Sequence, residues 1–506
     1  MKKLKPLCGL LAAMLIILCL NACSSPDEDI DTGSETEIGS DTGGDNPGDG
    51  TEPAGGAYAA LNNPVSQITL QFAESHTAMS FNWITAEAIS KTVIVYEKKS
   101  VYEKRVAEGS ATPFGYRNDG GVSYQIPGTN LWSHKISITG LEYDTEYVYS
   151  VGDDGSDTPV LESFKTRPAN VDKFTFVAFA DPQLASATET NFINIDASFT
   201  GHMKKHNIKP AFYVVAGDLV EDDKSDMWPV YFGAAKSTMM KYPFMTAVGN
   251  NDWRGVSFRN YLDRYNNPQN GPTTSTYAGL NPKVEGTVYS FEYGDAFFAV
   301  LNSEIDLALQ MKWLKDAASQ STKKWRIVMM HRNPFYAIKD VGSLWSTTSQ
   351  TFNELGIDLV LAGHDHQYSR VNYHKTSSNA NNTDSGKGYG TEYFKSDSNL
   401  AGLVERKTID GKQVPCFNAN NVAAYLTLST AGANRGATPA DFYTRFPWVD
   451  YADLADNIVP EHKTLTSGYG VIINVTSGYI ECVMMTCAFL VKDSAPVEAS
   501  RFRLEK

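Results

Sequence analysis

Five apolar segments of this chain each end next to a side chain that can bind a metal ion. The segments and the residues that follow them are 174–180 before Asp181, 211–217 before Asp218, 244–249 before Asn250, 325–330 before His331, and 357–363 before His364 and His366. Continuous apolar runs rich in Val, Ile and Phe are typical of strands that are buried on both faces. In an open α/β sheet, ligands bind outside the carboxyl ends of the strands. We therefore expect these side chains to converge on one crevice and to form a metal site.

Each of these motifs has an ordinary structural explanation when it is taken alone. Asp218 could be the N-cap of a helix, residues 249–252 could form a tight turn, and His331 could be a hydrogen-bonded core histidine. The motif at 363–366 is more indicative, because two histidines separated by one residue can reach into the same site. It is the whole set, in this order and at predicted strand ends, that indicates a metal centre.

Strands and helices alternate between these motifs. Apolar residues near helical spacing predict three helices, over residues 191–206, 227–240 and 306–318. Strands that alternate with helices of this length are typical of βαβ units and a mainly parallel sheet. Further strands are expected in a hairpin at 286–304 and over residues 424–430, 470–476 and 478–487.

Residues 58–168 carry strand patterns without a convincing helix. The expected strands cover residues 68–72, 78–84, 92–96, 135–138, 146–151 and 164–168. The segment 134–149 resembles the late strands of fibronectin type III-like domains, in which a Tyr closes the corner between two strands. We therefore expect an all-β, fibronectin III-like sandwich over 58–168.

The ordered motifs resemble those of the calcineurin-like metallophosphoesterase superfamily, whose members carry D-x-H or D-x-G, GD, GN[HN][DE], H and GHxH. The preceding fibronectin-like domain makes the chain look most similar to purple acid phosphatase-like enzymes, over about residues 58–490. The resemblance implies a mixed α+β and α/β fold over 171–495, with a four-layer β-sandwich core flanked by helices, and a binuclear metal centre. Carried over, one metal ion would be bound by Asp181 and His366, the other by Asn250, His331 and His364, and Asp218 would bridge the two.

Such a centre implies hydrolysis of phosphate esters. Two cations roughly 3.5–4 Å apart can share a carboxylate and a hydroxide, which lowers the pKa of water into the neutral range and prepares an in-line attack on phosphorus. Mixed nitrogen and oxygen ligands favour Fe, Mn or Zn over Ca. Arg332 and Arg370 lie beside the histidine motifs and are candidate phosphate ligands, although surface ion pairs explain them equally well.

We expect a small phosphorylated substrate, with phosphomonoesters favoured. The alternatives are a phosphodiesterase of the same fold and a non-catalytic surface lipoprotein that keeps the fold as a binding module. The polar stretch 371–420 and the aromatic residues of 441–451 could wall the substrate pocket. Those aromatic residues are Phe442, Tyr443, Phe446, Trp448 and Tyr451, and they could equally be core residues.

Three residues depart from the family pattern. Gln183 stands where the first motif has His or Gly, so the first metal ion would gain an amide oxygen or only water as a further ligand. Glu221 takes the place of the Tyr that binds ferric iron in purple acid phosphatases, which argues against a Tyr–Fe(III) enzyme. Asn251 replaces the His that commonly protonates the leaving group, and losing such an acid can cost about 10²–10⁴-fold on poor leaving groups. Asn251 therefore joins Asp218, Asn250 and His331 among the expected catalytic positions.

The N-terminal residues predict export and a lipid anchor. Three lysines within residues 2–5 precede an apolar run at 7–20 that is too short to span a membrane comfortably. The sequence Leu-Asn-Ala-Cys at 20–23 resembles the lipobox of bacterial lipoproteins, in which the cysteine, here Cys23, becomes the lipidated mature N-terminus. We expect a signal peptide at 1–22 and a membrane-anchored lipoprotein on the periplasmic or cell-surface face. An ordinary secretory signal with an incidental Cys23 is the alternative.

Residues 23–57 predict a disordered acidic tether. Ten acids and no Lys or Arg lie between Asp27 and Glu52, and a segment so poor in apolar residues cannot offset the entropy of ordering. These acids supply most of the net charge of −14, and the chain has no Lys/Arg-rich run, so no nucleic-acid partner is expected. The later cysteines at 416, 482 and 487 fit neither a disulfide framework nor a zinc knuckle, and we expect inert thiols.

Overall fold

The computed structural model describes residues 56–61, 64–152, 161–184, 186, 189–254, 259–335, 344–366, 368–375, 403–432, 467–488, 491 and 494–506. The predicted signal peptide, Cys23, nearly all of the acidic tether and the aromatic residues at 442–451 lie outside these ranges. Within them, no helix is both long enough and apolar enough to cross a membrane.

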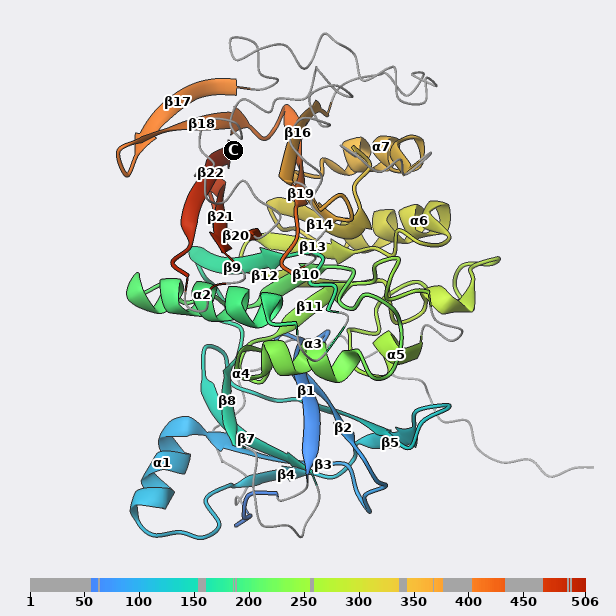
Figure 1. Cartoon of the computed structure of the whole chain (residues 1–506), viewed down its shortest axis with the longest axis vertical. Helices are drawn as coiled ribbons and strands as arrows, with labels where there is room; N and C mark the ends of the chain where they lie inside the picture. Colours follow the sequence, from blue (N-terminus) through green and yellow to red (C-terminus); the bar gives the residue numbers. More distant parts are fainter. Residues whose placement is uncertain are drawn as a thin grey trace, which may run out of the picture. The chain divides into compact units, whose positions relative to one another are not determined.

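The expected β-sandwich is confirmed, with two four-stranded antiparallel sheets (Figure 1). One sheet has the order β1-β2-β6-β5 and the other the order β4-β3-β7-β8. The strands are β1 (Val65–Phe72), β2 (Met79–Thr85), β3 (Val93–Lys98), β4 (Tyr116–Asn118), β5 (Val122–Gln125), β6 (Trp132–Ile138), β7 (Glu146–Gly152) and β8 (Glu162–Lys165). The ring of Phe81 from the first sheet packs 5.0 Å from Tyr149 and 5.5 Å from Phe164 of the second.

Two details of the sandwich bear on its prediction. The Tyr147 hydroxyl accepts a hydrogen bond of 3.0 Å from the backbone N–H of Glu142, as expected of a tyrosine that closes a corner between strands. The expectation that this domain has no helix is wrong, because α1 (Lys99–Ala107) follows β3. None of the α1 residues is buried, so this helix has no apolar face by which its sequence could be recognised.

The second domain contains two mixed sheets. Their orders are β11-β10-β9-β20-β21-β22-β18-β17 and β12-β13-β14-β15-β19-β16. The strands of the first are β9 (Lys173–Phe179), β10 (Tyr213–Ala216), β11 (Phe244–Ala247), β17 (Leu403–Ile409), β18 (Lys412–Asn418), β20 (Ser467–Thr476), β21 (Tyr479–Ala488) and β22 (Val497–Glu505). Those of the second are β12 (Tyr289–Tyr293), β13 (Ala296–Val300), β14 (Trp325–Arg332), β15 (Leu359–Gly363), β16 (Tyr368–His374) and β19 (Val422–Leu428).

Parallel pairing is confined to part of these sheets. The strands that carry the metal motifs pair in parallel, β10 with both β9 and β11 in one sheet and β14 with β15 in the other. Strands β20, β21 and β22 form an antiparallel meander on β9. The expectation of a mainly parallel sheet therefore holds around the motifs and is wrong for the C-terminal strands.

Alternate side chains of β9 show how the layers are arranged. Phe174 and Phe176 face the core between the two sheets, where Phe176 packs 5.4 Å from Phe298 of β13. Val177 and Phe179 face the opposite side, where Phe179 packs 5.0 Å from Phe199. Burial on both faces explains why the strand is continuously apolar from Phe176 to Phe179.

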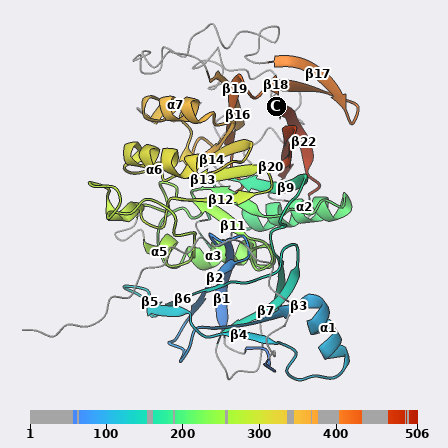
Figure 2. The same ribbon diagram turned by 180° about the vertical axis from the view of Figure 1, so that it is seen from behind.

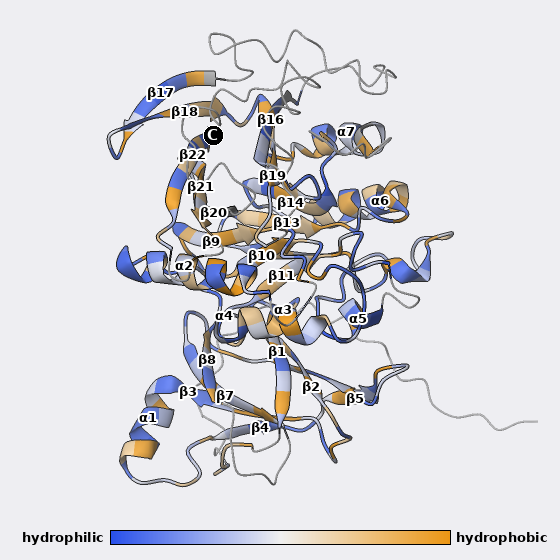
Figure 3. Ribbon diagram, in the orientation of Figure 1, coloured by the Kyte–Doolittle hydropathy of each residue, from blue (hydrophilic) through white to orange (hydrophobic). Residues whose placement is uncertain are grey.

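Helices cover the outer face of each sheet (Figures 1 and 2). They are α2 (Asn191–Lys205), α3 (Trp228–Ala234) and α4 (Lys236–Met239) on one side and α6 (Leu307–Ser319) and α7 (Leu344–Leu355) on the other. Figure 3 shows hydrophobic residues along the strands between them and mixed colouring on the helices. The four-layer core flanked by helices is confirmed.

Several predicted boundaries differ from the structure. The helix expected over 227–240 is two short helices, α3 and α4, which are separated at Ala235. The polar stretch expected at 371–420 to line a pocket contains the end of β16 and all of β17 and β18, while residues 376–402 lie outside the described ranges. Strand β22 pairs with β21 beyond residue 495, the predicted end of the domain.

The three later cysteines are buried free thiols. Burial raises the pKa of Cys416 to about 11 and that of Cys487 to about 12. This agrees with the expectation of inert thiols.

Candidate metal centre

The motif residues meet at the carboxyl ends of strands from both sheets of the second domain. Asp181, Asp218 and Asn250 follow β9, β10 and β11, whereas His331 lies near the end of β14 and the two later histidines follow β15. The expected crevice at the edge of one open sheet is therefore an edge shared by two sheets. The reason is that each sheet supplies one cluster of parallel strands, and both clusters end at the same place.

The ligands form two groups that share one residue. The ligand atoms within each group lie within 4.8 Å of one another, and the groups are Asp218, His331 and His364 on one side and Asp181, Asp218 and His366 on the other. All of these residues are buried. Asp218 belongs to both groups, which is the arrangement that a carboxylate bridging two cations requires.

Direct distances place Asn250 in the first group. Nε2 of His331 lies 3.3 Å from Oδ1 of Asp218 and 3.3 Å from Oδ1 of Asn250. In the second group, Nε2 of His366 lies 3.3 Å from Oδ1 of Asp181. The structure thus brings together all six of the ligands implied by the motifs.

Gln183 also lies in the site and supports its assignment as a metal site. Its Nε2 donates a hydrogen bond of 2.9 Å to Oδ2 of Asp218. Its Oε1 is buried and has no hydrogen-bond partner among the described residues. A buried acceptor of this kind normally has a partner, and a cation next to Asp218 would supply one. Together, the carboxylate, imidazole and amide groups fit a pair of first-row transition-metal ions.

Positive backbone φ angles are concentrated in these residues. They are 50° at Asp181, 43° at Gln183, 51° at Asp218, 73° at His364 and 54° at His366. Each such residue other than glycine costs on the order of 1–3 kcal/mol, and this strain is typical of functional sites that the surrounding fold holds in place.

Glycines that precede the ligands allow the strands to approach closely. A Cβ atom at Gly249 would lie 2.2 Å from Oδ1 of Asp218, and one at Gly363 would lie 2.3 Å from Oδ2 of Asp181. The glycines of the GN and GH motifs are therefore required because carboxylate ligands occupy the space of a side chain.

Further hydrogen bonds fix the orientation of the ligands. His331 Nδ1 lies 2.9 Å from the carbonyl oxygen of Ala216, so the ring presents Nε2 to Asp218. The backbone N–H of His364 donates to both carboxylate oxygens of Asp181, at 3.1 and 3.0 Å. Thr430 donates from Oγ1 to the carbonyl oxygen of Asp181 at 2.8 Å.

Asp252 is a structural residue of the site to which the sequence reasoning gave no role. Its carboxylate accepts hydrogen bonds from the backbone N–H groups of Leu219, Val220 and Gly249, at 2.9, 3.2 and 2.8 Å. It thereby joins the loop after Asp218 to the loop that contains Asn250. The acidic residue that closes the GN[HN][DE] pattern was the available signal.

The charges in the site are strongly coupled. Burial raises the pKa of Asp218, but His331, the backbone N–H of Asn251 and His366 together outweigh it and leave this pKa below its ordinary value. Burial lowers the pKa of His331, yet the carboxylates of Asp218, Asp181 and Glu304 raise it to about 10. Buried negative charge on this scale stabilises bound cations.

Both domains match known families. Residues 65–166 match the N-terminal domain of purple acid phosphatases, and residues 174–368 match the calcineurin-like phosphoesterases. The chain belongs to the purple acid phosphatase-like metallophosphoesterases.

Individual relatives agree with this assignment. An uncharacterised protein of Mycobacterium tuberculosis is 25% identical over 352 residues, which cover 61% of this chain and 62% of that protein. Purple acid phosphatase 23 of Arabidopsis thaliana is 26% identical over 357 residues, which cover 58% of this chain and 72% of the relative. The chain thus spans less than two thirds of the length of the mycobacterial relative.

A solved structure has the same fold. The purple acid phosphatase PPD1 from yellow lupin (Lupinus luteus) seeds superimposes with a TM-score of 0.60 at 13% sequence identity. The match covers 88% of this chain and 74% of the lupin chain.

Two of the departures from the metallophosphoesterase pattern remain close to the ligands. The backbone N–H of Asn251 donates to Oδ1 of Asp218 at 2.8 Å, and its side-chain Oδ1 accepts from Nδ2 of Asn250 at 2.9 Å. Glu221 lies three residues after Asp218, and its backbone N–H donates to the carbonyl oxygen of Leu184 at 3.3 Å. The structure therefore keeps Asn251 within the site, where its amide cannot act as a general acid.

The two candidate phosphate-binding arginines lie in different environments. Arg332 forms a bidentate ion pair with Glu304, with distances from 2.8 to 3.0 Å, and its Nη1 lies 3.1 Å from Nε2 of His364. The guanidinium of Arg370 instead lies 4.9 Å from the ring centroid of Phe417 and 4.7 Å from that of Phe502. Packing between two aromatic rings accounts for the burial of Arg370 without a phosphate.

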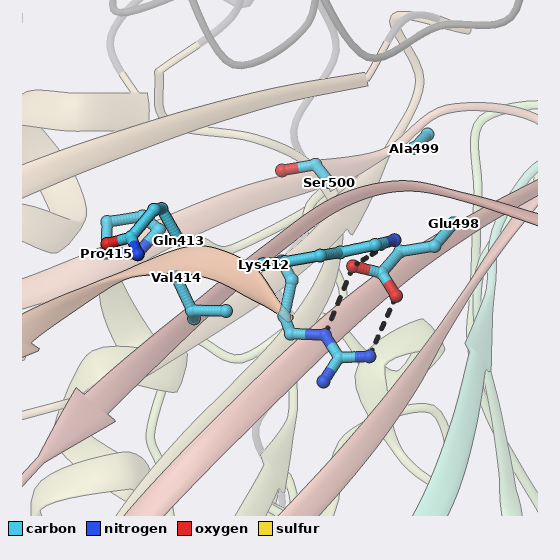
Figure 4. A pocket seen from close by; sticks show the side chains of 8 residues that line it. Lys412, Gln413, Val414, Pro415, Glu498, Ala499 and Ser500 are labelled. Carbon is cyan, nitrogen blue, oxygen red and sulfur yellow. Dashed lines mark hydrogen bonds and ion pairs between the residues drawn. The ribbon is translucent and has the colours of Figure 1, made fainter. Parts of the chain in front are cut away.

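A hollow elsewhere in the second domain contains none of the site residues. It has a volume of about 330 Å³ and lies between β18 and β22 (Figure 4). Lys412 of β18 pairs with Glu498 of β22 across it at 3.1 Å, and Arg501 pairs with Glu498 along β22 at 2.7 Å. Its charged side chains therefore satisfy one another.

We predict that Gly363→Ala disrupts metal binding without unfolding the protein. The added methyl group would contact Oδ2 of Asp181 and displace this ligand, so metal affinity should fall by about 10–100-fold, as for other changes next to a ligand. Metal content can be measured by elemental analysis and folding by circular dichroism. The matched control is Gly201→Ala in α2, where no atom lies within 4 Å of the added methyl. Equal metal content in the two variants would contradict the prediction.

Proposed function

We propose that this protein hydrolyses phosphate esters at a two-metal centre, with phosphomonoesters preferred over phosphodiesters. The observation that carries the proposal is the set of buried ligands in two groups that share Asp218. The family assignment supports the same class of reaction.

The residues of this chain would have distinct tasks in the reaction. Asp181, Gln183 and His366 would hold one ion, Asn250, His331 and His364 would hold the other, and Asp218 would contact both. When bound, the two cations would activate water and neutralise charge on the phosphoryl group. The Ala216 carbonyl and the His364 backbone N–H would keep the His331 and Asp181 ligands in place.

Arg332 is the side chain that we propose to bind a phosphoryl oxygen. It places a permanent positive charge beside His364, and its pairing with Glu304 holds the guanidinium in one orientation. Because Glu304 also neutralises part of this charge, Arg332 would orient the substrate more than it would attract it.

We propose Fe, Mn or Zn as the bound metals. One relative, 21% identical over 337 residues, is named as an Fe(3+)-Zn(2+) purple acid phosphatase from Arabidopsis thaliana. This chain has Glu221 where those enzymes have the iron-binding Tyr, so we do not expect the purple colour of a Tyr–Fe(III) pair.

The function predicts that Asp218→Asn lowers turnover of p-nitrophenyl phosphate by roughly two to three orders of magnitude, because the amide cannot supply the charge that both metal sites share. Metal content should fall in parallel. Bis-p-nitrophenyl phosphate, assayed beside it, separates a monoesterase from a diesterase. Asp226→Asn is the control, since Asp226 is exposed on the same segment.

A wild-type protein that binds metal but hydrolyses neither substrate would favour the binding module over the enzyme. Activity that is unchanged in Asp218→Asn would overturn the assignment of this site.

Replacing Asn251 with His should restore a proton donor. We expect Asn251→His to raise turnover of an alkyl phosphate by roughly tenfold or more relative to p-nitrophenyl phosphate, because a poor leaving group needs the proton and a good one does not. Asn251→Gln tests the change in size without a donor. An equal effect of Asn251→His on both substrates would refute the missing-acid argument.

We further propose that the protein is a membrane-anchored lipoprotein, on the basis of the lipobox-like sequence that ends at Cys23. Cys23→Ser should then move the protein from the detergent phase to the aqueous phase in a phase-partition assay of the expressing bacterium. Partition into the aqueous phase by the unchanged protein would argue for an ordinary secretory signal.

A further inference from the structure

We propose that the β-sandwich domain takes part in the reaction by fixing the loop that follows Asp218, and that Gln67 and Arg264 are positioning residues for this loop. The inference rests on the proposed function, because the loop at 219–223 matters through its continuity with the shared ligand Asp218. It assigns a task to a domain that contributes no metal ligand of its own among the described residues.

The loop at 219–223 is held at both ends by side chains of later residues, Asp252 and Asn260. Asp252 accepts hydrogen bonds from the backbone N–H groups of Leu219 and Val220 at the start of the loop. Asn260 donates from Nδ2 to the carbonyl oxygen of Asp223 at its end, at 3.1 Å. Any displacement of Asn260 would therefore move the end of the loop that begins at Asp218.

Arg264 connects Asn260 to the β-sandwich. Its Nη1 donates to both the carbonyl oxygen and Oδ1 of Asn260, at 3.0 Å each, and its Nε donates to Oε1 of Gln67 at 2.7 Å. The guanidinium is fully buried and lies 5.4 Å from the ring centroid of Trp228. Trp228 in turn donates from Nε1 to Oδ1 of Asp223 at 3.1 Å, so Arg264 is linked to the loop through both Asn260 and Trp228.

The backbone of β1 is distorted at Gln67. The pairing register of β1 with β2 shifts between Ser66 and Thr69, and Gln67 has a φ of 52°. A bulge of this kind costs backbone energy and redirects a side chain, and it persists where the redirected side chain has a task. Here the redirected side chain is the one that accepts the hydrogen bond from Arg264.

Several other bonds between the two domains end on the backbone of the segment at 262–265. Thr69 donates from Oγ1 to the carbonyl oxygen of Arg264 at 3.1 Å, and Lys135 donates from Nζ to the carbonyl oxygens of Leu262 and Tyr265 at 2.5 and 2.8 Å. These bonds dock the segment on the sandwich. The bond from Arg264 to Gln67 differs from them because its donor is the guanidinium group. The same group donates to Asn260 and packs on the ring of Trp228.

This difference can be tested in the full-length protein with two variants of neighbouring β1 residues. Gln67→Ala removes the side-chain acceptor for the Arg264 guanidinium. Thr69→Val, two residues further along β1, removes the hydrogen bond to the Arg264 carbonyl oxygen and leaves the bonds of the guanidinium in place. A variant of Arg264 itself is unsuitable, because it would leave buried polar groups without partners. Gln67→Glu keeps the acceptor oxygen and should restore wild-type behaviour.

Two measurements apply to each variant. Amide hydrogen exchange of peptides covering 219–224, on chelator-treated protein, reports how firmly the loop is held. Competition with a chromophoric chelator reports the affinity for Zn²⁺. We expect roughly tenfold faster exchange and roughly tenfold weaker Zn²⁺ binding in Gln67→Ala, as for other residues that orient ligands at a distance, and wild-type values for both in Thr69→Val.

Wild-type exchange and Zn²⁺ affinity in Gln67→Ala would overturn the inference. Equal changes in Gln67→Ala and Thr69→Val would also overturn it, because domain docking in general would then explain the effect. A wild-type protein that binds no Zn²⁺ would count against the proposed function alone, since the exchange comparison in metal-free protein still decides whether Gln67 holds the loop.

Discussion

The carboxylate of Asp218 is the constraint on which the rest of the site depends. It is only 1% exposed, and a buried carboxylate is tolerated only where hydrogen bonds and positive charge compensate for lost hydration. Gln183 and the backbone of Asn251 supply the hydrogen bonds, and His331 supplies charge. These partners come from different strands of two sheets, so stabilising one side chain requires both sheets to end at the same place.

Much of the site could be predicted because its signals are local. A buried strand is recognisable from its apolar run, and the polar residue after it marks the carboxyl end. The assignment of those strands to two sheets was not predictable in this way, because an apolar run does not specify which strand pairs with it. The GN[HN][DE] pattern marks the position of Asp252 but not its role, because its three partners are backbone N–H groups from two loops that the pattern does not connect.

In the fold as well, the predictable features are those with a local sequence signal. Six of the eight sandwich strands are predicted by β-branched and alternating residues, whereas the short strands β4 and β5 are not. Helix α1 is not predicted either, because none of its residues is buried. Strands β17 and β18 lie in a stretch whose polar residues predict a pocket wall. Strand β17 is at the edge of its sheet, and the polar residues of an edge strand resemble those of a loop. The aromatic environment of Arg370 depends on β18 and β22 meeting beside β16, and no spacing in the sequence indicates that meeting.

The burial of the cysteines determines how their thiols react with oxidants and disulfides. A thiol reacts with oxidants and disulfides through its thiolate, and burial holds the pKa values of Cys416 and Cys487 far above neutrality. Neither thiol would be ionised to any useful extent at physiological pH. These buried thiols are therefore poor targets for oxidants and for disulfide exchange in the folded domain.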